Sequence, residues 1–185
     1  MKSICKHMGL VVAQLLTLPA ALLALFGRFP PGFQFFAHVL AQLPGLPGDY
    51  LRAAYYQFTL ESFGKDSRIQ YGSFFAHPQA IVGSGVYIGS YCVLGKAAIG
   101  DHTQIASGVQ ILSGRRQHAR GEDGSIEGSH SGEFTRVSVG GNCWIGAGAI
   151  VMADIGSGTT VGAGAVVVKP LPDNCVAVGN PAKPR

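Results

Sequence analysis

The chain has 185 residues, of which 47% are hydrophobic, only 13% are charged and 27 are glycine, and its formal net charge at pH 7 is +4. This length and composition suit one folded domain with an appendage, and the small positive charge suits an anionic ligand or a membrane surface. Nucleic-acid binding is not expected, because no run of basic residues interleaves with aromatic residues.

Two apolar segments open the chain. Residues 9–26 carry no charge, and as a helix they would be ~27 Å long, just short of the hydrocarbon core of a bilayer. Residues 32–43 follow Pro30 and Pro31. Two apolar helices around a Pro-Pro turn predict a hairpin that dips into a membrane with both ends on one side. The flanking basic residues place that side in the cytoplasm. They are Lys2, Lys6, Arg52 and Lys65.

Two alternatives for this region stay open. Residues 9–26 could form a single span or a secretory signal, although no clear small-x-small cleavage site follows and the apolar character continues beyond Arg28. The helices could also be a soluble pair packed against the rest of the chain. The hairpin is the preferred interpretation. It makes residues 1–65 a membrane-associating helical region, at the cytoplasmic face of a bacterial inner membrane.

A third helix is predicted from Asp49, as N-cap, to about Gly64. It has a wide apolar stripe made of Leu51, Tyr55, Phe58, Tyr56, Leu60 and Phe63. Arg52, Gln57 and Glu61 are expected outside this stripe. Such a helix suits either a bilayer surface or a packed position on the next part of the chain.

An aliphatic residue then returns every six positions, usually with a glycine behind it. The series is Val82, Ile88, Leu94, Ile99 after a five-residue step, Ile105, Ile111, Val139, Ile145, Val151, Ile155, Val161 and Val167. A period of six fits neither a helix nor a simple strand. It fits a chain that makes one short strand and one corner per repeat, with three repeats completing a triangular coil. The prediction is a parallel β-helix over residues 66–185, recognised on the stretch 76–167.

The fifth position of each repeat is small or slim, as a crowded corner requires. It is occupied by Val86, Cys92, Thr103, Val109, Cys143, Ala149, Thr159 and Ala165. Cys92 and Cys143 are therefore predicted to be buried packing residues. With Cys5 and Cys175 they form no C-x-x-C pair. This argues against a disulfide framework or a zinc site and favours a reducing compartment.

The repeat breaks once, over residues 113–136. This segment holds eight of the 24 charged residues and two of the six histidines, His118 and His130. A long unpatterned loop inside a compact repeat is usually functional or disordered. Its place after Ile111 predicts an arm that leaves one corner and can reach a neighbouring prism.

Residues 71–183 resemble the left-handed β-helix acyltransferases, the hexapeptide-repeat family of the maltose, galactoside and polysaccharide O-acetyltransferases. The resemblance is carried by the hexads, the His-bearing loop, Gly140-Gly-Asn-Cys-Trp-Ile-Gly146 and Val178-Gly-Asn-Pro-Ala-Lys183. It implies a left-handed β-helix and a homotrimer with active sites between adjacent prisms. It also implies acetyl-CoA or another acyl-CoA as donor, and no metal.

The resemblance assigns the general base to His118. Acyl transfer needs a group that removes a proton from the acceptor hydroxyl as it attacks the thioester carbonyl, and an imidazole does this well near neutral pH. The oxyanion that forms needs fixed donors, for which backbone N–H groups of the facing coil are candidates. His130 is the competitor within the loop.

Further site residues follow from the same resemblance. The sole tryptophan, Trp144, follows a small fifth position and should project outwards, beside the cofactor. The other expected cofactor-binding residues are Gly146, Ala163, Lys183 and Arg115. Of these, Lys183 and Arg115 could pair with the phosphates of the cofactor. The expected substrate-binding residues are Arg116, Tyr91 and His130.

The resemblance does not identify the acceptor. Ser90-Tyr91-Cys92 occupies the region where the sugar enzymes carry an Asn or Asp partner, and the repeat before Ile155 is short, which turns Asp154 outwards. The hydrophobic N-terminal region suggests a saccharide or a lipid-linked or amphiphilic acceptor at the membrane.

Two other functions compete with acyl transfer. One is a non-catalytic trimeric membrane scaffold. The other is a zinc enzyme like the γ-type carbonic anhydrases, which would require a His-x-x-x-x-His pair that this sequence lacks.

Overall fold

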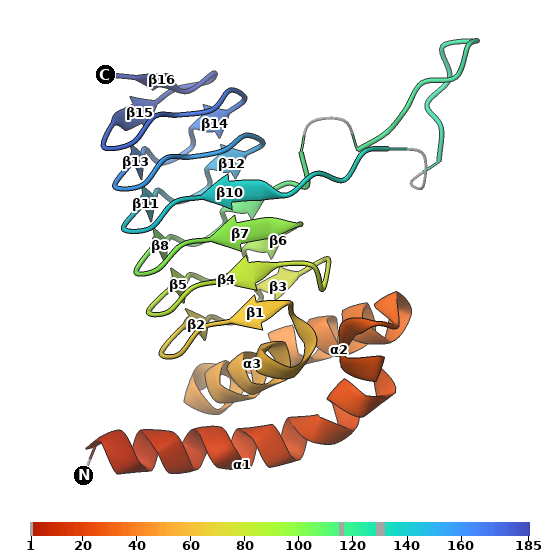
Figure 1. Ribbon diagram of the computed structural model, residues 1–185, viewed down its shortest axis with the longest axis vertical. Helices are drawn as coiled ribbons and strands as arrows, with labels where there is room; N and C mark the ends of the chain where they lie inside the picture. The colour runs from red at the N-terminus through yellow and green to blue at the C-terminus, as the bar shows by residue number, and fades with distance from the viewer. Residues whose placement is uncertain (1, 115–116, 129–131) are drawn as a thin grey trace.

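The computed structural model describes residues 2–114, 117–128 and 132–185. A parallel β-helix of about six turns stands on a layer of helices (Figure 1). The helices are α1 (Lys2–Leu23), η1 (Leu25–Gly27), α2 (Pro30–Ala41) and α3 (Gly45–Thr59). The prediction of a mainly β fold preceded by helices is confirmed.

Three sheets form the faces of the prism, and each of the first four coils contributes one strand to each sheet. Face A contains β1 (Ser62–Phe63), β4 (Ile81–Val82), β7 (Ala97–Ile99) and β10 (Val137–Val139). Face B contains β2 (Arg68–Ile69), β5 (Tyr87–Ile88), β8 (Gln104–Ile105), β11 (Trp144–Ile145), β13 (Thr160–Val161), β15 (Val176–Val178) and β16 (Lys183–Pro184). Face C contains β3 (Phe74–Phe75), β6 (Val93–Leu94), β9 (Gln110–Ile111), β12 (Ile150–Val151) and β14 (Val166–Val167). Among the strands of these three sheets, β16 alone runs antiparallel to its neighbour, β15.

The core consists of aliphatic side chains stacked in register from coil to coil. On face B, Ile88 pairs with Ile105, and Ile105 with Ile145. On face A the column continues beyond β10, through bridges from Val139 to Ile155 and from Ile155 to Leu171. Every aliphatic residue of the predicted series is at most 3% exposed. The fifth-position residues, including Cys92 and Cys143, are also buried, as predicted.

The β-helix begins at Ser62, before the stretch on which the repeat is recognisable in the sequence. The predicted extension of the third helix to Gly64 is therefore wrong. Leu60 is already extended (φ −84°, ψ 161°), because the chain turns there to pair β1 with β4.

The start of this helix also differs from the prediction. Helix α3 begins at Gly45, after Pro44, and not at Asp49. Pro47 is tolerated in the first turn, where its missing N–H would have no partner within the helix.

Arg52 lies inside the protein, although the sequence pattern placed it outside the apolar stripe. It is fully buried and joins three parts of the fold. Its guanidinium donates to the carbonyls of Leu40 and Leu43 (2.9 and 2.6 Å), to that of Ile69 on the first coil (2.9 Å) and to the Asp49 carboxylate (2.7 Å). The Asp49 carboxylate is paired with Arg52 and does not serve as the N-cap of the helix.

The two apolar segments of the predicted membrane hairpin form α1 and α2, and they make their main contacts with a third helix. Helices α1 and α2 each pack mainly on α3, and α3 lies against the first coil. Helix α1 runs across the end of the prism, beneath α3 (Figure 1). Pro30 and Pro31 form the first turn of α2.

Ile105→Ala tests the stacked core. Because Ile105 is fully buried between Ile88 and Ile145, we expect the free energy of unfolding to fall by about 2–5 kcal/mol. Urea denaturation followed by circular dichroism measures the change. The matched control is Gln104→Ala on the outer side of the same strand, and equal losses in the two variants would contradict a dry, interlocked core.

Candidate active site

A long arm leaves the prism between β9 and β10. In the part of the chain that the structure describes, residues 112–136 contain no strand, as the break in the repeat predicted. The arm projects sideways from the corner between faces C and A (Figure 1). Its two ends are joined at the prism, where Thr135 N donates to Ser113 O (3.1 Å).

His118 lies on the outgoing limb of the arm and is exposed. The two limbs pass close together at this point, because a Cβ on Gly132 would collide with the carbonyl of Gln117 and reach within 2.7 Å of His118 N. Only glycine allows this approach. The backbone around His118 is thus fixed by the opposite limb, while its side chain is exposed.

The tip of the arm is a small antiparallel turn. Arg120 bridges Ile126, and Gly121 N donates to Ser125 O (3.0 Å). The Asp123 carboxylate accepts from the backbone and hydroxyl of Ser125 (3.0 and 2.6 Å), and these bonds lower its pKa. The tip therefore has internal structure of its own.

The root of the arm packs on side chains that the sequence did not single out. The Phe134 ring lies 5.3 Å from the His77 ring and 5.8 Å from Lys96 Nζ, and Phe134 O accepts from Lys96 (3.4 Å). Arg136 pairs with Glu61. His77 is half-buried, and burial, followed by the charge of Lys96, lowers its pKa. His77 was not among the candidate site residues, and its proximity to Phe134 has no local signal in the sequence.

Trp144 lies on the outer side of β11 in face B and is 60% exposed, as predicted. Two other cofactor candidates lie beside it. Gly146 directly follows the same strand and is buried, and a Cβ there would collide with the backbone nitrogen of Ala163 on the next coil. Ala163 is exposed at the corner between faces B and C. The fold thus brings these three residues onto one edge of the prism.

The remaining candidates are more dispersed. Lys183 pairs with Val178 in the last coil, on the same face and nearer the end of the prism. Tyr91 is exposed and contacts Tyr71 (ring centroids 5.5 Å apart), three coils from Ala163 at the same corner. Three coils correspond to about 14 Å. Arg115, Arg116 and His130 lie outside the described residues.

Asp154 is exposed, in line with the short repeat, but its carboxylate has a structural partner. It accepts a hydrogen bond from Ser138 N (2.8 Å) on the preceding coil. Within the described residues, no three His, Cys, Asp or Glu side chains lie together in a way that could hold a metal ion.

The arm and Trp144 lie on opposite sides of one prism. The arm leaves the corner between faces C and A, and in a triangular cross-section this corner is opposite face B. One chain therefore does not bring His118 close to Trp144. A site that uses both needs two copies of the chain.

Solved structures share this fold. A galactoside acetyltransferase in complex with coenzyme A has 19% identity and a TM-score of 0.63, over 85% of this chain and 82% of that chain. A maltose O-acetyltransferase from Clostridium difficile 630 has 24% identity and a TM-score of 0.61, over 85% and 87%. AntD, an N-acyltransferase from Bacillus cereus in complex with dTDP and 3-hydroxybutyryl-CoA, has 20% identity and a TM-score of 0.54, over 68% and 82%. No protein-family model and no curated protein matches the chain.

His77 should make stability depend on pH. Its folded-state pKa is lowered, so the unfolded chain binds more protons once the pH falls below about 6.5. Stability is then present above that pH and is lost as the pH falls through the folded-state pKa. We expect His77→Gln to flatten this loss in urea unfolding measured between neutral pH and pH ~5.

Lys96→Met is the companion variant. It should retain most of the pH dependence, because burial is the larger cause of the shift. If wild type and His77→Gln lost stability in parallel, the contribution of His77 would be refuted.

Proposed function

We propose that the chain is an O-acyltransferase that moves an acyl group, acetyl by preference, from a coenzyme A thioester to a hydroxyl of a saccharide or lipid-linked acceptor. One observation carries the proposal. An arm with an exposed histidine leaves one corner of a β-helix, and the opposite face presents an exposed tryptophan beside a glycine-lined edge.

The proposal assigns a homotrimer to the active form. In a closed ring of parallel prisms, the arm of each copy can reach the Trp144 edge of the next. The structures of galactoside acetyltransferase and AntD support a thioester donor, since each was determined with coenzyme A or an acyl-CoA bound. The acceptors of those two enzymes are not assigned to this chain.

His118 is the proposed general base. Its imidazole takes the proton of the acceptor hydroxyl while the hydroxyl oxygen forms a bond to the thioester carbonyl carbon. Backbone N–H groups at the edge would stabilise the resulting oxyanion. The carbon–sulfur bond then breaks, and the sulfur of coenzyme A leaves with the proton from the imidazole.

The donor side of the site is proposed to lie along face B. Trp144 offers a flat apolar surface for the donor, and the small side chain of the exposed Ala163 leaves room for it. Gly146 lets the next coil approach closely, which sets the position of Ala163 beside Trp144. Lys183 and Arg115 supply positive charge for phosphate groups. On the acceptor side, Arg116, Tyr91 and His130 are the proposed contacts.

We also propose that the enzyme works at the cytoplasmic face of a bacterial inner membrane. Residues 1–48 include Lys2, Lys6 and Arg28 but no acidic residue. Lys6 is paired with Asp66, whereas Arg28 is exposed and supports binding to an anionic surface.

His118→Ala should lower turnover by about 10²–10⁴-fold, because the acceptor proton loses its base. Thiol release from acetyl-CoA in the presence of saccharide acceptors measures the rate. The control is His102→Asn, on an exposed turn of the prism where φ is +59°, and it should keep wild-type turnover. A scaffold that binds partners without turnover, or an unchanged rate in His118→Ala, would refute the proposal.

Trp144→Ala should raise the KM for the thioester about tenfold or more while kcat changes little, because it removes a donor contact rather than a proton acceptor. The native tryptophan is the only one in the chain, so its fluorescence should also change on titration with coenzyme A. Val93→Ala on face C is the matched control. A flat fluorescence titration together with an unchanged KM would exclude Trp144 from the donor site.

A further inference from the structure

Helix α1 carries its larger apolar side chains on the outside. The side that packs on α3 is made of small residues, Ala13, Thr17 and Ala21, each at most 3% exposed. The exposed side is made of Met8, Val11, Val12, Leu15, Leu16, Leu22 and Leu23. At 100° per residue these form an arc of about 140° opposite the small residues. Leu25, Phe26 and Phe29 extend this exposed surface, here called the apolar base.

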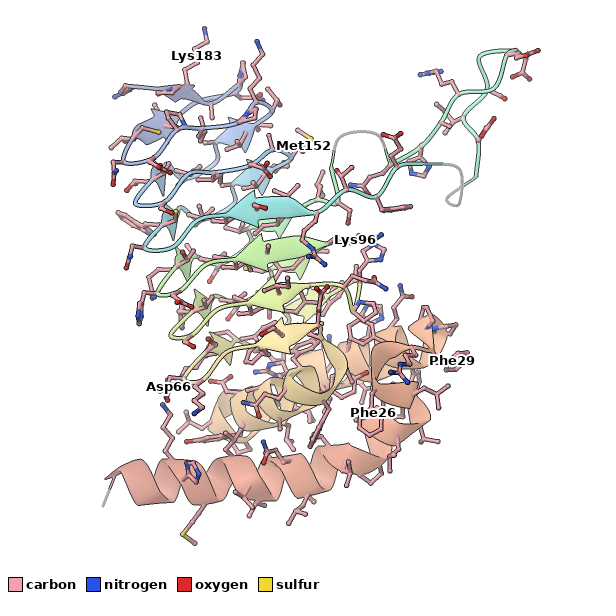
Figure 2. All side chains as sticks on the ribbon, in the orientation of Figure 1. Phe26, Phe29, Asp66, Lys96, Met152 and Lys183 are labelled. Carbon is pink, nitrogen blue, oxygen red and sulfur yellow. The ribbon has the colours of Figure 1, made fainter. Side chains whose placement is uncertain are left out.

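The apolar base lies at one end of the molecule. Figure 2 shows Phe26 and Phe29 at the helical end, and Lys183 at the far end of the prism. Helix α1 runs across this end and not along the prism (Figure 1). A water-soluble surface helix has the reverse arrangement, with apolar residues inward and polar residues outward, so the apolar base needs an occupant.

Charge and shape favour an anionic lipid surface as that occupant. Residues 1–48 contain three Lys and Arg residues and no acidic residue. Lys6 is paired with Asp66, but Arg28 is exposed and precedes Phe29 of the apolar base, which suits anionic headgroups. An apolar groove of about 400 Å³ opens beside the arc, between α1 and the start of α3. It is lined by Met8, Val12, Leu16, Leu46, Pro47 and Tyr50, among others. Such a groove offers room for an acyl chain of the lipid.

Helix α1 is held parallel to the end of the prism. Its segment Lys6–Leu23 is apolar and long enough to cross a membrane by composition and length alone. In the fold, however, Lys6 pairs with Asp66 on the first coil, and Gln14 donates to Gln57 of α3 (2.8 Å). Together with the small residues packed on α3, these contacts fix the helix in plane. This geometry is that of an interfacial helix, buried about 5–10 Å into the headgroup boundary.

The position of the arm then has a consequence for the acceptor. Two helix layers of about 10 Å each and the coils below the arm, at about 4.8 Å per coil, separate the base from the arm by about 30 Å. Subtracting the depth to which the helix is buried leaves the arm about 20–25 Å above the headgroup boundary. The headgroup region of one leaflet is only about 5–8 Å thick. A hydroxyl on an ordinary lipid headgroup therefore does not reach the candidate site.

We infer that α1 docks flat on an anionic bilayer with the prism upright, and that the acceptor hydroxyl is carried well above the lipid, as on a lipid-linked oligosaccharide. The part concerning the acceptor rests on the proposed function. It narrows the acceptor from any membrane amphiphile to one with a long hydrophilic head.

Tryptophan quenching tests the orientation. Wild-type protein is bound to vesicles of phosphatidylcholine and phosphatidylglycerol whose acyl chains are brominated. The native Trp144 should keep its fluorescence, because it lies on the prism. The double variant Trp144→Phe/Leu16→Trp should be strongly quenched. Quenching of Trp144 in the bound protein, or no quenching at position 16, would overturn the upright orientation.

Binding variants test the occupant. Leu15→Glu/Leu16→Glu should weaken vesicle flotation at least tenfold, whereas Val93→Glu, an exposed apolar position on the prism, should not. Arg28→Gln should weaken binding about fivefold, and Lys169→Gln, at the other end of the prism, should leave it unchanged. If the apolar base instead pairs two molecules, sedimentation should show a mass that doubles with concentration, and the protein should not bind vesicles. That result would refute lipid as the partner of the apolar base.

Acceptor length provides the last test. On vesicles, turnover should rise at least tenfold from a glycolipid with one sugar to one with a long oligosaccharide. Equal turnover on both would overturn the acceptor inference and leave the proposed function standing. No turnover on any acceptor, with the quenching pattern as expected, would instead refute the proposed function, because quenching does not depend on catalysis.

Discussion

The architecture depends on one constraint, which is that each coil must stack on the coil below it at the spacing of neighbouring β-strands, about 4.8 Å. An inward side chain then meets its equivalent above and below, as Ile105 meets Ile88 and Ile145. Mostly aliphatic residues fill these columns, with Phe75 below Leu94 in the first coil, and small or slim residues fit at the corners. Chemistry is therefore confined to outward positions such as Trp144 and to the one place where the coil is interrupted. The arm is the largest departure from the repeat, and it carries the histidine that the proposed reaction needs.

Much of the prism could be predicted from the sequence, because the stacking constraint acts on every sixth residue and leaves a local record. The buried columns, the small corners at Cys92 and Cys143, and the break after Ile111 all follow from it. The packing of the helices produces no such repeated pattern in the sequence. Arg52 is charged and reads as a surface residue, but it is buried because carbonyls of three different segments and Asp49 converge on it. Helix α1 reads as a membrane hairpin with α2, but its small residues pack on α3, and this contact is set by a partner far along the chain.

The exposure of two candidate site residues could be predicted from the sequence, but their arrangement around the prism could not. Exposure of Trp144 follows from its place after a small corner residue, and exposure of His118 from its place in an unpatterned segment. That the two lie on opposite sides of the prism depends on counting faces around the coil. The packing of Phe134 on His77 and Lys96, which sets the root of the arm, joins positions with no sequence relation. Neither the sequence nor the fold identifies the acceptor. The strongest physical constraint on the acceptor is the height of the arm above the apolar base.

The central claim is that each site is completed by two copies of the chain, and mixing two defective variants tests it most directly. His118→Ala chains and Trp144→Ala chains are unfolded together, refolded at equal concentration and assayed with thioester well below its KM. If the arm of one copy serves the edge of the next, one interface in four joins an intact arm to an intact edge, and turnover should recover to about a quarter of the wild-type value. If each chain instead forms its own site, the mixture would be no more active than the average of the two variants, and the account would be contradicted.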